Sequence, residues 1–141
     1  MSSVYDVIVV GVGSMGASTC FRLAERGVHV LGLEQGPLPN PEASFTGATR
    51  AIRLSYSEHP DYVPLLMRAY ELWEEIGEIV GRPLLHLTGA VYMGLPDGET
   101  VAGAHRSAKT HGLAHALLTH EELSERWPQF RLPETFVGLH E

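Results

Sequence analysis

The chain has 141 residues, of which 44% are hydrophobic, and this length and composition suit a globular protein with a packed core. Its formal net charge of −7 argues against binding to nucleic acid or to an anionic membrane surface, because no cluster of Lys or Arg offsets the acidic excess. The single cysteine, Cys20, leaves no disulfide framework and no thiolate metal site, and no apolar run reaches the ~20 residues of a membrane span. We find no signal-peptide pattern at the start of the sequence and expect a protein of the reducing cytoplasm.

A glycine-rich turn near the start of the chain carries the clearest functional signal. A short β-branched run over residues 5–10 leads into Gly11-Val12-Gly13-Ser14-Met15-Gly16, and a helical stretch follows over residues 14–26. A second apolar run, residues 28–33, then places Glu34 at its end. This order of strand, glycine turn, helix, strand and acid is the fingerprint of a βαβ unit that binds an adenine dinucleotide.

Each residue of the glycine turn has a role that the chemistry requires. Gly11 permits the tight turn after the strand, Gly13 leaves room for a pyrophosphate, and Gly16 lets helix and strand pack closely. The N–H groups of the first helical turn, at Ser14 and Met15, are expected to face the phosphates together with the positive end of the helix dipole. The alternative, a glycine turn without a ligand, would be preferred for an isolated GxGxxG motif but not for one in this setting.

The acid after the second strand predicts which dinucleotide is bound. The carboxylate of Glu34 is expected to accept hydrogen bonds from the adenosine ribose hydroxyls, and its charge would repel a 2′-phosphate, so NADP is disfavoured. Gln35, the next residue, is assigned to the same site. The cofactor-binding residues predicted from this first part of the chain are Gly11, Gly13, Ser14, Met15, Gly16, Glu34 and Gln35.

The rest of the chain predicts a loop and then a second set of elements. Residues 36–47 form a Pro-, Ser- and Asn-bearing loop in a position to cover the cofactor, and a compact segment follows over residues 49–56. The elements expected after it are a helix from an Asp61 N-cap to about Val80, a strand at 87–95, a small-residue helix at 99–111 closed by Gly112, a strand at 113–118, a short helix with a Thr119 capping box that Trp127-Pro128 terminates, and a strand at 135–141. His111 and His115 lie four residues apart but lack a third ligand, so no metal site is predicted.

The domain organisation follows from this order of elements. Only one βαβ unit is legible, whereas a parallel sheet normally needs several crossovers, so we expect the front part of a longer protein. The predicted fold class is α/β, with a dinucleotide-binding domain over residues 1–84 and the beginning of an α+β substrate domain over residues 85–141.

Several segments of the chain, taken in order, indicate the protein family to which it is similar. The fingerprint has the long form Asp6–Gly16 followed by Arg22–Glu34, and after it come Gly47-Ala48-Thr49-Arg50-Ala51-Ile52-Arg53, the stretch Tyr62–Trp73, and Arg126-Trp127-Pro128. Together they resemble the FAD-dependent amine and amino-acid oxidases, and the later segments resemble the monomeric sarcosine oxidase and N-methyltryptophan oxidase branch. Each later segment is weak alone, and their order along essentially the whole chain makes the resemblance specific.

The resemblance implies a cofactor, a reaction and a set of site residues. FAD would be held by the Rossmann-like βαβ unit, and a secondary amine or N-methyl amino acid would pass a hydride to flavin N5, with O2 then reduced to H2O2. Thr49 and Arg50 would lie against the flavin ring and also bind the cofactor. Arg53 would hold the substrate carboxylate, for which a guanidinium offers a permanent charge and a planar fork. These three residues are the predicted catalytic residues, the partner is a small-molecule amine or amino acid, and the oligomeric state is not assigned.

The chain departs from the family pattern at two places near the flavin and the substrate. Phe45-Thr46-Gly47-Ala48 stands where close members typically carry His-His-Gly-Asp, and Leu54-Ser55 stands where they often carry His-Ala. Sarcosine itself is therefore not assigned as the substrate. The family's flavin-linking cysteine belongs to its later half, and Cys20, in the first helix, does not replace it. The alternatives are a glycine-oxidase-like deaminase or flavin dehydrogenase, an NAD-dependent dehydrogenase, which would not account for Thr49–Arg53, and a catalytically silent nucleotide-binding fragment.

Overall fold

A computed structural model describes residues 4–141, and Met1 to Ser3 of the predicted domain 1–84 lie outside the described residues. The chain divides into two compact units, unit 1 (Met1–Ala51) and unit 2 (Ile52–Glu141). The sequence predicted a change of domain at 84/85, whereas the compact units divide after Ala51, so the long central helix belongs to unit 2. Compact units and the domains of a complete enzyme need not coincide, so the division at 84/85 stays a prediction.

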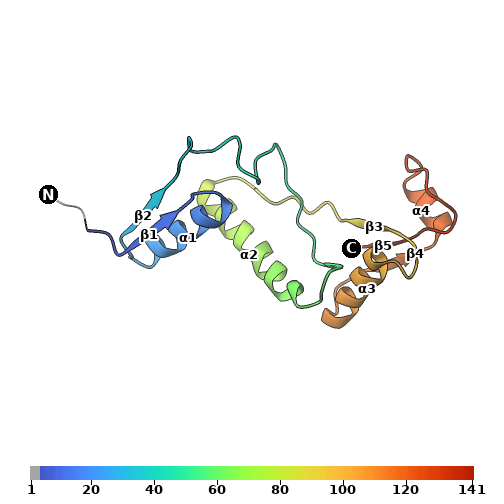
Figure 1. Ribbon diagram of the computed structural model, residues 1–141. Coiled ribbons are helices and arrows are strands. Elements are labelled where there is room, and N and C mark those ends of the chain that lie inside the picture. Colours follow the sequence, from blue (N-terminus) through green and yellow to red (C-terminus); the bar gives the residue numbers. More distant parts are fainter. Residues whose placement is uncertain (1–3) are drawn as a thin grey trace. The chain divides into compact units, whose positions relative to one another are not determined.

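Unit 1 contains the βαβ arrangement that the glycine turn predicts (Figure 1). Strand β1 (Val7–Val10), helix α1 (Ser14–Glu25) and strand β2 (Val30–Leu33) follow one another, and the two strands pair in parallel, with Val7 opposite Val30. Parallel neighbours need such a crossover helix between them. The expected α/β fold class with a Rossmann-like unit is confirmed.

The two-stranded sheet of unit 1 leaves apolar side chains in solvent. Ile8 and Val10 of β1 are 57% and 82% exposed, and Leu33 of β2 is 46% exposed. Helix α1 contains no buried residue. Parallel sheets in α/β proteins are covered on both faces, so these side chains mark surface for which unit 1 itself supplies no cover.

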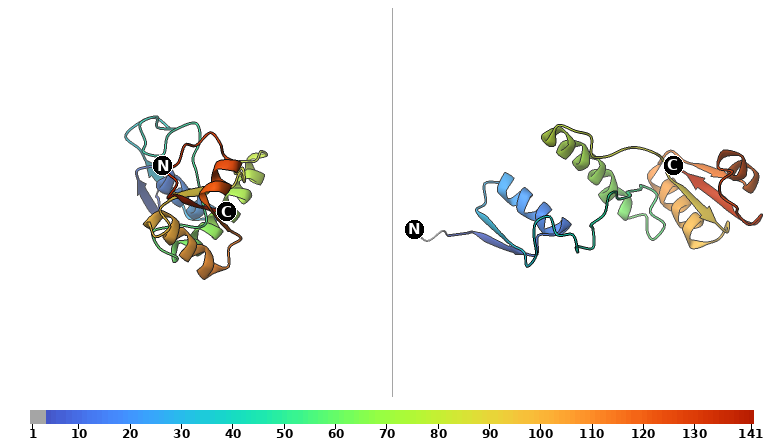
Figure 2. Two further views of the ribbon diagram at one scale, coloured as in Figure 1. Left: turned by 90° about the vertical axis from the view of Figure 1, so that its right-hand side faces the viewer. Right: turned by 90° about the horizontal axis from the view of Figure 1, so that it is seen from above.

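Unit 2 places a three-stranded antiparallel sheet beside a helix. Its elements are α2 (Tyr62–Val80), β3 (Val91–Gly94), α3 (Glu99–His111), β4 (Ala116–Leu118), α4 (His120–Arg126) and β5 (Val137–His140). The strand order is β3-β5-β4, so the last strand in the chain is the central one. Figure 2 shows α3 lying along this sheet. The sheet and α3 form the α+β arrangement expected for the later part of the chain.

Strands β3 and β4 are shorter than the sequence predicted, for reasons that lie in the backbone. The run expected from residue 87 is interrupted at Gly89, whose φ of +73° is not extended, and β3 begins at Val91. The strand expected from residue 113 begins later because Leu113 belongs to the end of α3. Gly112 has a φ of +63°, and the N–H of Leu113 donates to the carbonyl of Ala108 at 2.9 Å. This is the Schellman type of helix end.

Two predicted helix starts have different outcomes. At α4 the capping box is confirmed, because the N–H of Glu122 donates to Thr119 Oγ1 at 3.3 Å and the N–H of Thr119 donates to Glu122 Oε2 at 2.8 Å. At α2, Asp61 occupies the N-cap position, but its side chain makes no capping hydrogen bond and its backbone is already helical. The expected capping contact of Asp61 is therefore wrong.

Helix α3 is rich in small residues because it is packed on two sides. One side contributes Val101 and Ala104 to a core with Tyr92 and Leu139. On another side, Ser107 Oγ donates to the carbonyl of Tyr56 at 2.5 Å. Gly103 approaches the same segment so closely that a Cβ there would overlap the carbonyl oxygen of Ser57.

Gly103→Ala tests this close approach. Alanine favours an exposed helix by about 1 kcal/mol, but here the added methyl collides with backbone, and overpacking of this kind costs about 1–3 kcal/mol. We expect a lower free energy of unfolding, measured by urea denaturation of the complete natural polypeptide that includes residues 1–141. Gly94→Ala is the control, because its Cβ would meet only Val101 Cγ2 at 3.6 Å, an ordinary contact. Equal stability of the Gly103→Ala variant and the parent would contradict the packing described.

Candidate functional site

The turn between β1 and α1 can be built only with glycine at two positions. Gly11 has a φ of +87°, a conformation that L residues with side chains rarely adopt. At Gly16 a Cβ would overlap the carbonyl oxygen of Gly11. Helix α1 thereby starts directly against the end of β1, which is the close packing that the sequence predicts for the third glycine.

Gly13 leaves open the position from which a phosphate would approach α1. A Cβ at Gly13 would meet only the ring of Phe45, with Cε1 at 3.6 Å. The first backbone hydrogen bond of α1 runs from the N–H of Ala17 to the carbonyl of Gly13 at 2.8 Å. The N–H groups of Ser14 and Met15 come before it, among those that a helix start leaves without an intrahelical partner. The positive end of this helix, with Gly13 beside it and Phe45 as the nearest side chain, fits a dinucleotide pyrophosphate.

The carboxylate of Glu34 ties the end of β2 to the glycine turn. Its Oε2 accepts the N–H of Val12 at 2.7 Å, and its Oε1 accepts the N–H groups of Gln35 at 3.0 Å and Gly36 at 3.4 Å. The hydrogen bond from Val12 is the largest cause that lowers the pKa of Glu34. A hydrogen bond with the Asn40 side chain lowers this pKa as well. An ionised carboxylate has about four acceptor positions, so a ribose hydroxyl would share or displace one of these donors. The sequence did not predict the bond to Val12, since the two residues are 22 positions apart.

Arg50, Thr49 and Gln35 lie on the surface of unit 1. The Arg50 guanidinium donates to the carbonyl of Thr49 at 2.6 Å and to that of Thr46, and Gln35 and Thr49 are exposed. Arg53 belongs to unit 2, so the structure does not bring the three predicted catalytic residues together in one unit. The contacts of Arg50, Thr49 and Gln35 with a flavin stay predictions.

Arg53 is held by aromatic rings in unit 2. Its guanidinium carbon lies 5.2 Å from the centroid of the Tyr56 ring and 5.5 Å from that of Tyr92, distances at which a cation is attracted to the face of a ring. The side chain is partly buried, and across the described residues no carboxylate lies within ion-pairing distance of it. The positive charge of Arg53 is therefore fixed in place but not neutralised.

Arg53 and two residues near it in the chain or the sheet, Ser55 and Tyr92, have buried polar atoms without partners in the described part of the chain. Among the described residues, Arg53 Nε, Ser55 Oγ and the Tyr92 hydroxyl are buried without a hydrogen-bond partner. Burial, reinforced by the negative charge of Glu141, raises the pKa of Tyr92 well above its ordinary value, so this hydroxyl stays protonated. Buried polar groups normally find partners, and these atoms are available to a polar ligand or to water.

The residues near Arg53 carry little signal in the sequence. Tyr56 directly follows the departure at Leu54-Ser55 and belongs to no motif. Tyr92 is a buried position of β3, and nothing local distinguishes it from an ordinary core aromatic. Glu141 follows β5, and its carboxylate accepts the N–H groups of Leu54 and Ser55. Only the folded chain brings these residues to Arg53.

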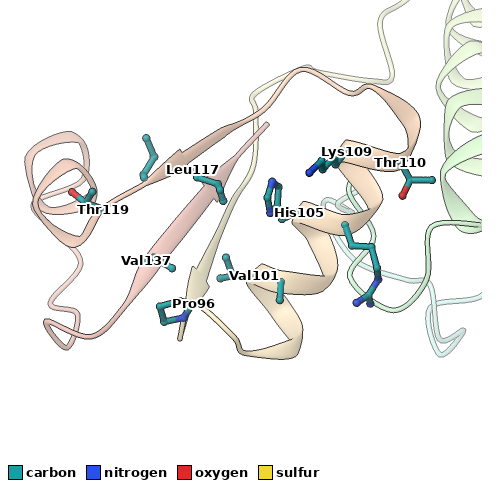
Figure 3. A pocket seen from close by; sticks show the side chains of 11 residues that line it. Pro96, Val101, His105, Lys109, Thr110, Leu117, Thr119 and Val137 are labelled. Atoms are coloured by element: carbon teal, nitrogen blue, oxygen red, sulfur yellow. The ribbon is translucent and has the colours of Figure 1, made fainter.

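A pocket of about 730 Å³ lies elsewhere in unit 2 (Figure 3). Val101, His105 and Lys109 of α3 line one side, and Leu117 and Val137 line the other. None of the predicted site residues borders it. Within the part of the chain that the structure describes, no three His, Cys, Asp or Glu residues group as metal ligands, and no helix is both long and apolar enough to span a bilayer.

The βαβ unit and its glycine turn are those of a dinucleotide-binding domain, and comparisons with known proteins identify its family. The sequence pattern of the FAD dependent oxidoreductase family matches residues 6–141. The chain belongs to this family, and the expected cofactor, FAD, is confirmed at that level.

Individual relatives narrow the type of oxidoreductase. Monomeric sarcosine oxidase of Streptomyces avermitilis is 46% identical over all of this chain and 37% of its own length. N-methyl-L-tryptophan oxidase of Salmonella arizonae is 36% identical over 97% of this chain and 37% of its own length. Among solved structures, the open form of NikD, an unusual amino acid oxidase essential for nikkomycin biosynthesis, superposes with a TM-score of 0.83 at 28% identity, covering 99% of this chain and 36% of NikD.

These matches confirm the resemblance to the sarcosine oxidase and N-methyltryptophan oxidase type of FAD-dependent oxidoreductase. They also agree with the expectation of a longer protein, since the chain spans little more than a third of the length of each relative.

Gly13→Ala separates cofactor binding from folding. The added methyl meets only Phe45 at an ordinary distance, so we expect the free energy of unfolding of the apoprotein to stay near that of the parent. The same methyl obstructs the phosphates, and losing one or more charged hydrogen bonds, each worth about 1.5–3 kcal/mol, weakens FAD binding roughly 10- to 150-fold. Fluorescence titration with FAD and thermal unfolding measure the two effects in the complete polypeptide.

Gly16→Ala is the matched variant, because its methyl overlaps the backbone of Gly11. It should lower both stability and FAD affinity, whereas Ser18→Ala, on the exposed side of α1, should lower neither. An unchanged FAD dissociation constant for Gly13→Ala would show that the glycine turn does not bind the phosphates.

Proposed function

We propose that residues 1–141 belong to an FAD-dependent oxidase of secondary amines or N-methyl amino acids. The glycine turn and Glu34 would hold the adenosine pyrophosphate half of FAD. When bound, FAD supplies N5 as the hydride acceptor and is reoxidised by O2, which becomes H2O2. The substrate loses its hydride from the carbon next to nitrogen, and water hydrolyses the resulting imine to an amine and an aldehyde, which is formaldehyde when an N-methyl group is oxidised.

The proposed substrate class rests on the position of Arg53 and on its lack of an acidic partner among the described residues. A guanidinium fixed against Tyr56 and Tyr92, without an acidic partner among the described residues, supports recognition of an anion. A carboxylate suits its planar fork and would satisfy the buried Nε as well. Binding the carboxylate at a fixed point orients the amine, which lowers the entropy that must be lost before hydride transfer.

Thr49 and Arg50 are proposed to lie beside the flavin ring, as the resemblance implies. The exposed guanidinium of Arg50 would place positive charge near the ring, which stabilises its anionic reduced form. Phe45, which packs over Gly13 where close relatives carry a histidine, supports a substrate other than sarcosine. We retain domains 1–84 and 85–141 as the proposed cofactor and substrate parts.

The proposed activity can be measured directly. The complete natural polypeptide, purified, should show the visible absorption bands of a flavin and should form H2O2 with N-methyl amino acids. A matching N-methyl alkylamine without a carboxylate should be a much poorer substrate. A colourless protein would support the NAD-dependent or silent alternatives, and a flavoprotein active on primary amino acids alone would support the glycine-oxidase-like one.

Arg53→Ala should remove the preference for carboxylate substrates. Losing a charged hydrogen bond worth about 1.5–3 kcal/mol lowers kcat/KM for the N-methyl amino acid roughly 10- to 150-fold, while kcat/KM for the alkylamine stays near the parent value. Arg53→Lys should fall between, because it keeps the charge without the fork. Arg50→Ala should change the flavin spectrum instead, and exposed Arg131→Ala should change neither. Equal losses for the acid and the alkylamine would exclude Arg53 from carboxylate binding.

A further inference from the structure

Glu141 joins the end of the central strand to the segment that carries Arg53. Its backbone continues the sheet beyond β5, since Glu141 N–H and Ala90 carbonyl, and Ala90 N–H and Glu141 carbonyl, are each 3.0 Å apart. Its side chain turns to residues 86 and 87 positions earlier: Oε1 accepts the N–H of Leu54 at 2.9 Å, and Oε2 accepts the N–H of Ser55 at 2.7 Å. One carboxylate thus holds two successive amides.

These two amides are the ones that directly follow Arg53. The segment has no regular secondary structure, and Ser55 is fully buried. In such a segment the N–H groups have no helix or sheet partner, and leaving one buried and unpaired is costly. The Glu141 carboxylate is therefore a principal constraint on the backbone at Leu54 and Ser55. It thereby also constrains the direction in which the Arg53 side chain points.

The same carboxylate leaves the charge of Arg53 free. Both of its oxygens accept backbone N–H groups, and it forms no ion pair with Arg53 across the described residues. The guanidinium rests instead against Tyr92, whose hydroxyl stays neutral because burial and the charge of Glu141 raise its pKa. Glu141 thus orients the arginine through the backbone without competing with a bound anion.

We propose that Glu141 is a positioning residue for Arg53: by fixing the N–H groups of Leu54 and Ser55 to the end of β5, it holds the guanidinium in the orientation that selects carboxylate substrates. This inference rests on the proposed function of Arg53. It adds a residue of the substrate part that acts on the arginine through the backbone of Leu54 and Ser55.

The test uses the complete natural polypeptide and compares an N-methyl amino acid with its decarboxylated N-methyl alkylamine. Glu141→Ala should raise KM for the acid about tenfold or more, since a displacement of about 1 Å in a positioning group can cost up to about a hundredfold. The kcat at saturation and the kinetics with the alkylamine should stay near those of the parent. Glu141→Gln, which keeps one acceptor oxygen for the two amides, should give an intermediate KM. Exposed Glu134→Gln, on the same unit, is the control and should change nothing.

Two further measurements separate positioning from general damage. Amide hydrogen exchange at Leu54 and Ser55 should become faster in Glu141→Ala. In the Arg53→Ala background, Glu141→Ala should cause no further loss of preference for the acid, because the two substitutions act on one interaction.

The outcomes distinguish this inference from the proposed function. If Arg53→Ala abolishes the preference for the acid but Glu141→Ala leaves it intact, the positioning role is wrong and the proposed function stands. Equal losses with acid and alkylamine in Glu141→Ala, or unchanged exchange at Leu54 and Ser55, would likewise show that Glu141 does not position Arg53. If Arg53→Ala leaves the preference unchanged, the proposed function fails and the role of Glu141 fails with it.

Discussion

The contact between Gly16 and the carbonyl of Gly11 is the constraint on which unit 1 depends. It brings the start of α1 against the end of β1 at a distance that no side chain permits. The first-turn N–H groups of α1 then lie at the carboxyl edge of the two parallel strands, where open α/β sheets bind their ligands. Glu34 reaches the same edge from β2 and accepts the N–H of Val12. The arrangement of N–H groups at this edge is thus a consequence of backbone packing.

The sequence predicted best the features that short segments determine by themselves. The glycine turn, the capping box of α4 and the end of α3 at Gly112 each depend on a few consecutive residues, and the structure agrees with all three. The limits of β3 and β4 were harder to predict, because the composition of both runs is typical of strands. The backbone at Gly89 shortens the first run, and the end of α3 at Leu113 shortens the second.

The surroundings of Arg53 could not be predicted from the sequence, since Tyr92 and Glu141 reach it only through the pairing of β3 with β5. The same contacts bear on why Leu54-Ser55 can differ from the family pattern. Glu141 binds the N–H groups of these residues, and any residue except proline offers one. The backbone contacts therefore place no demand on the side chain at position 54, whereas the full burial of Ser55 limits position 55 to small side chains.

The position of β5 between β3 and β4 also determines when the sheet of unit 2 can form during synthesis. Both outer strands hydrogen-bond only to β5 within this sheet, so neither has a partner until residues 137–140 have been made. Synthesis proceeds at about 5–20 residues per second, so roughly 1 to 4 seconds separate the completion of β4 from that of β5. The contacts of Glu34 in the nucleotide turn need nothing beyond Asn40. On the ribosome, the backbone next to Arg53 is therefore fixed by Glu141 only after residue 141 has been made, well after the turn that precedes it in the chain.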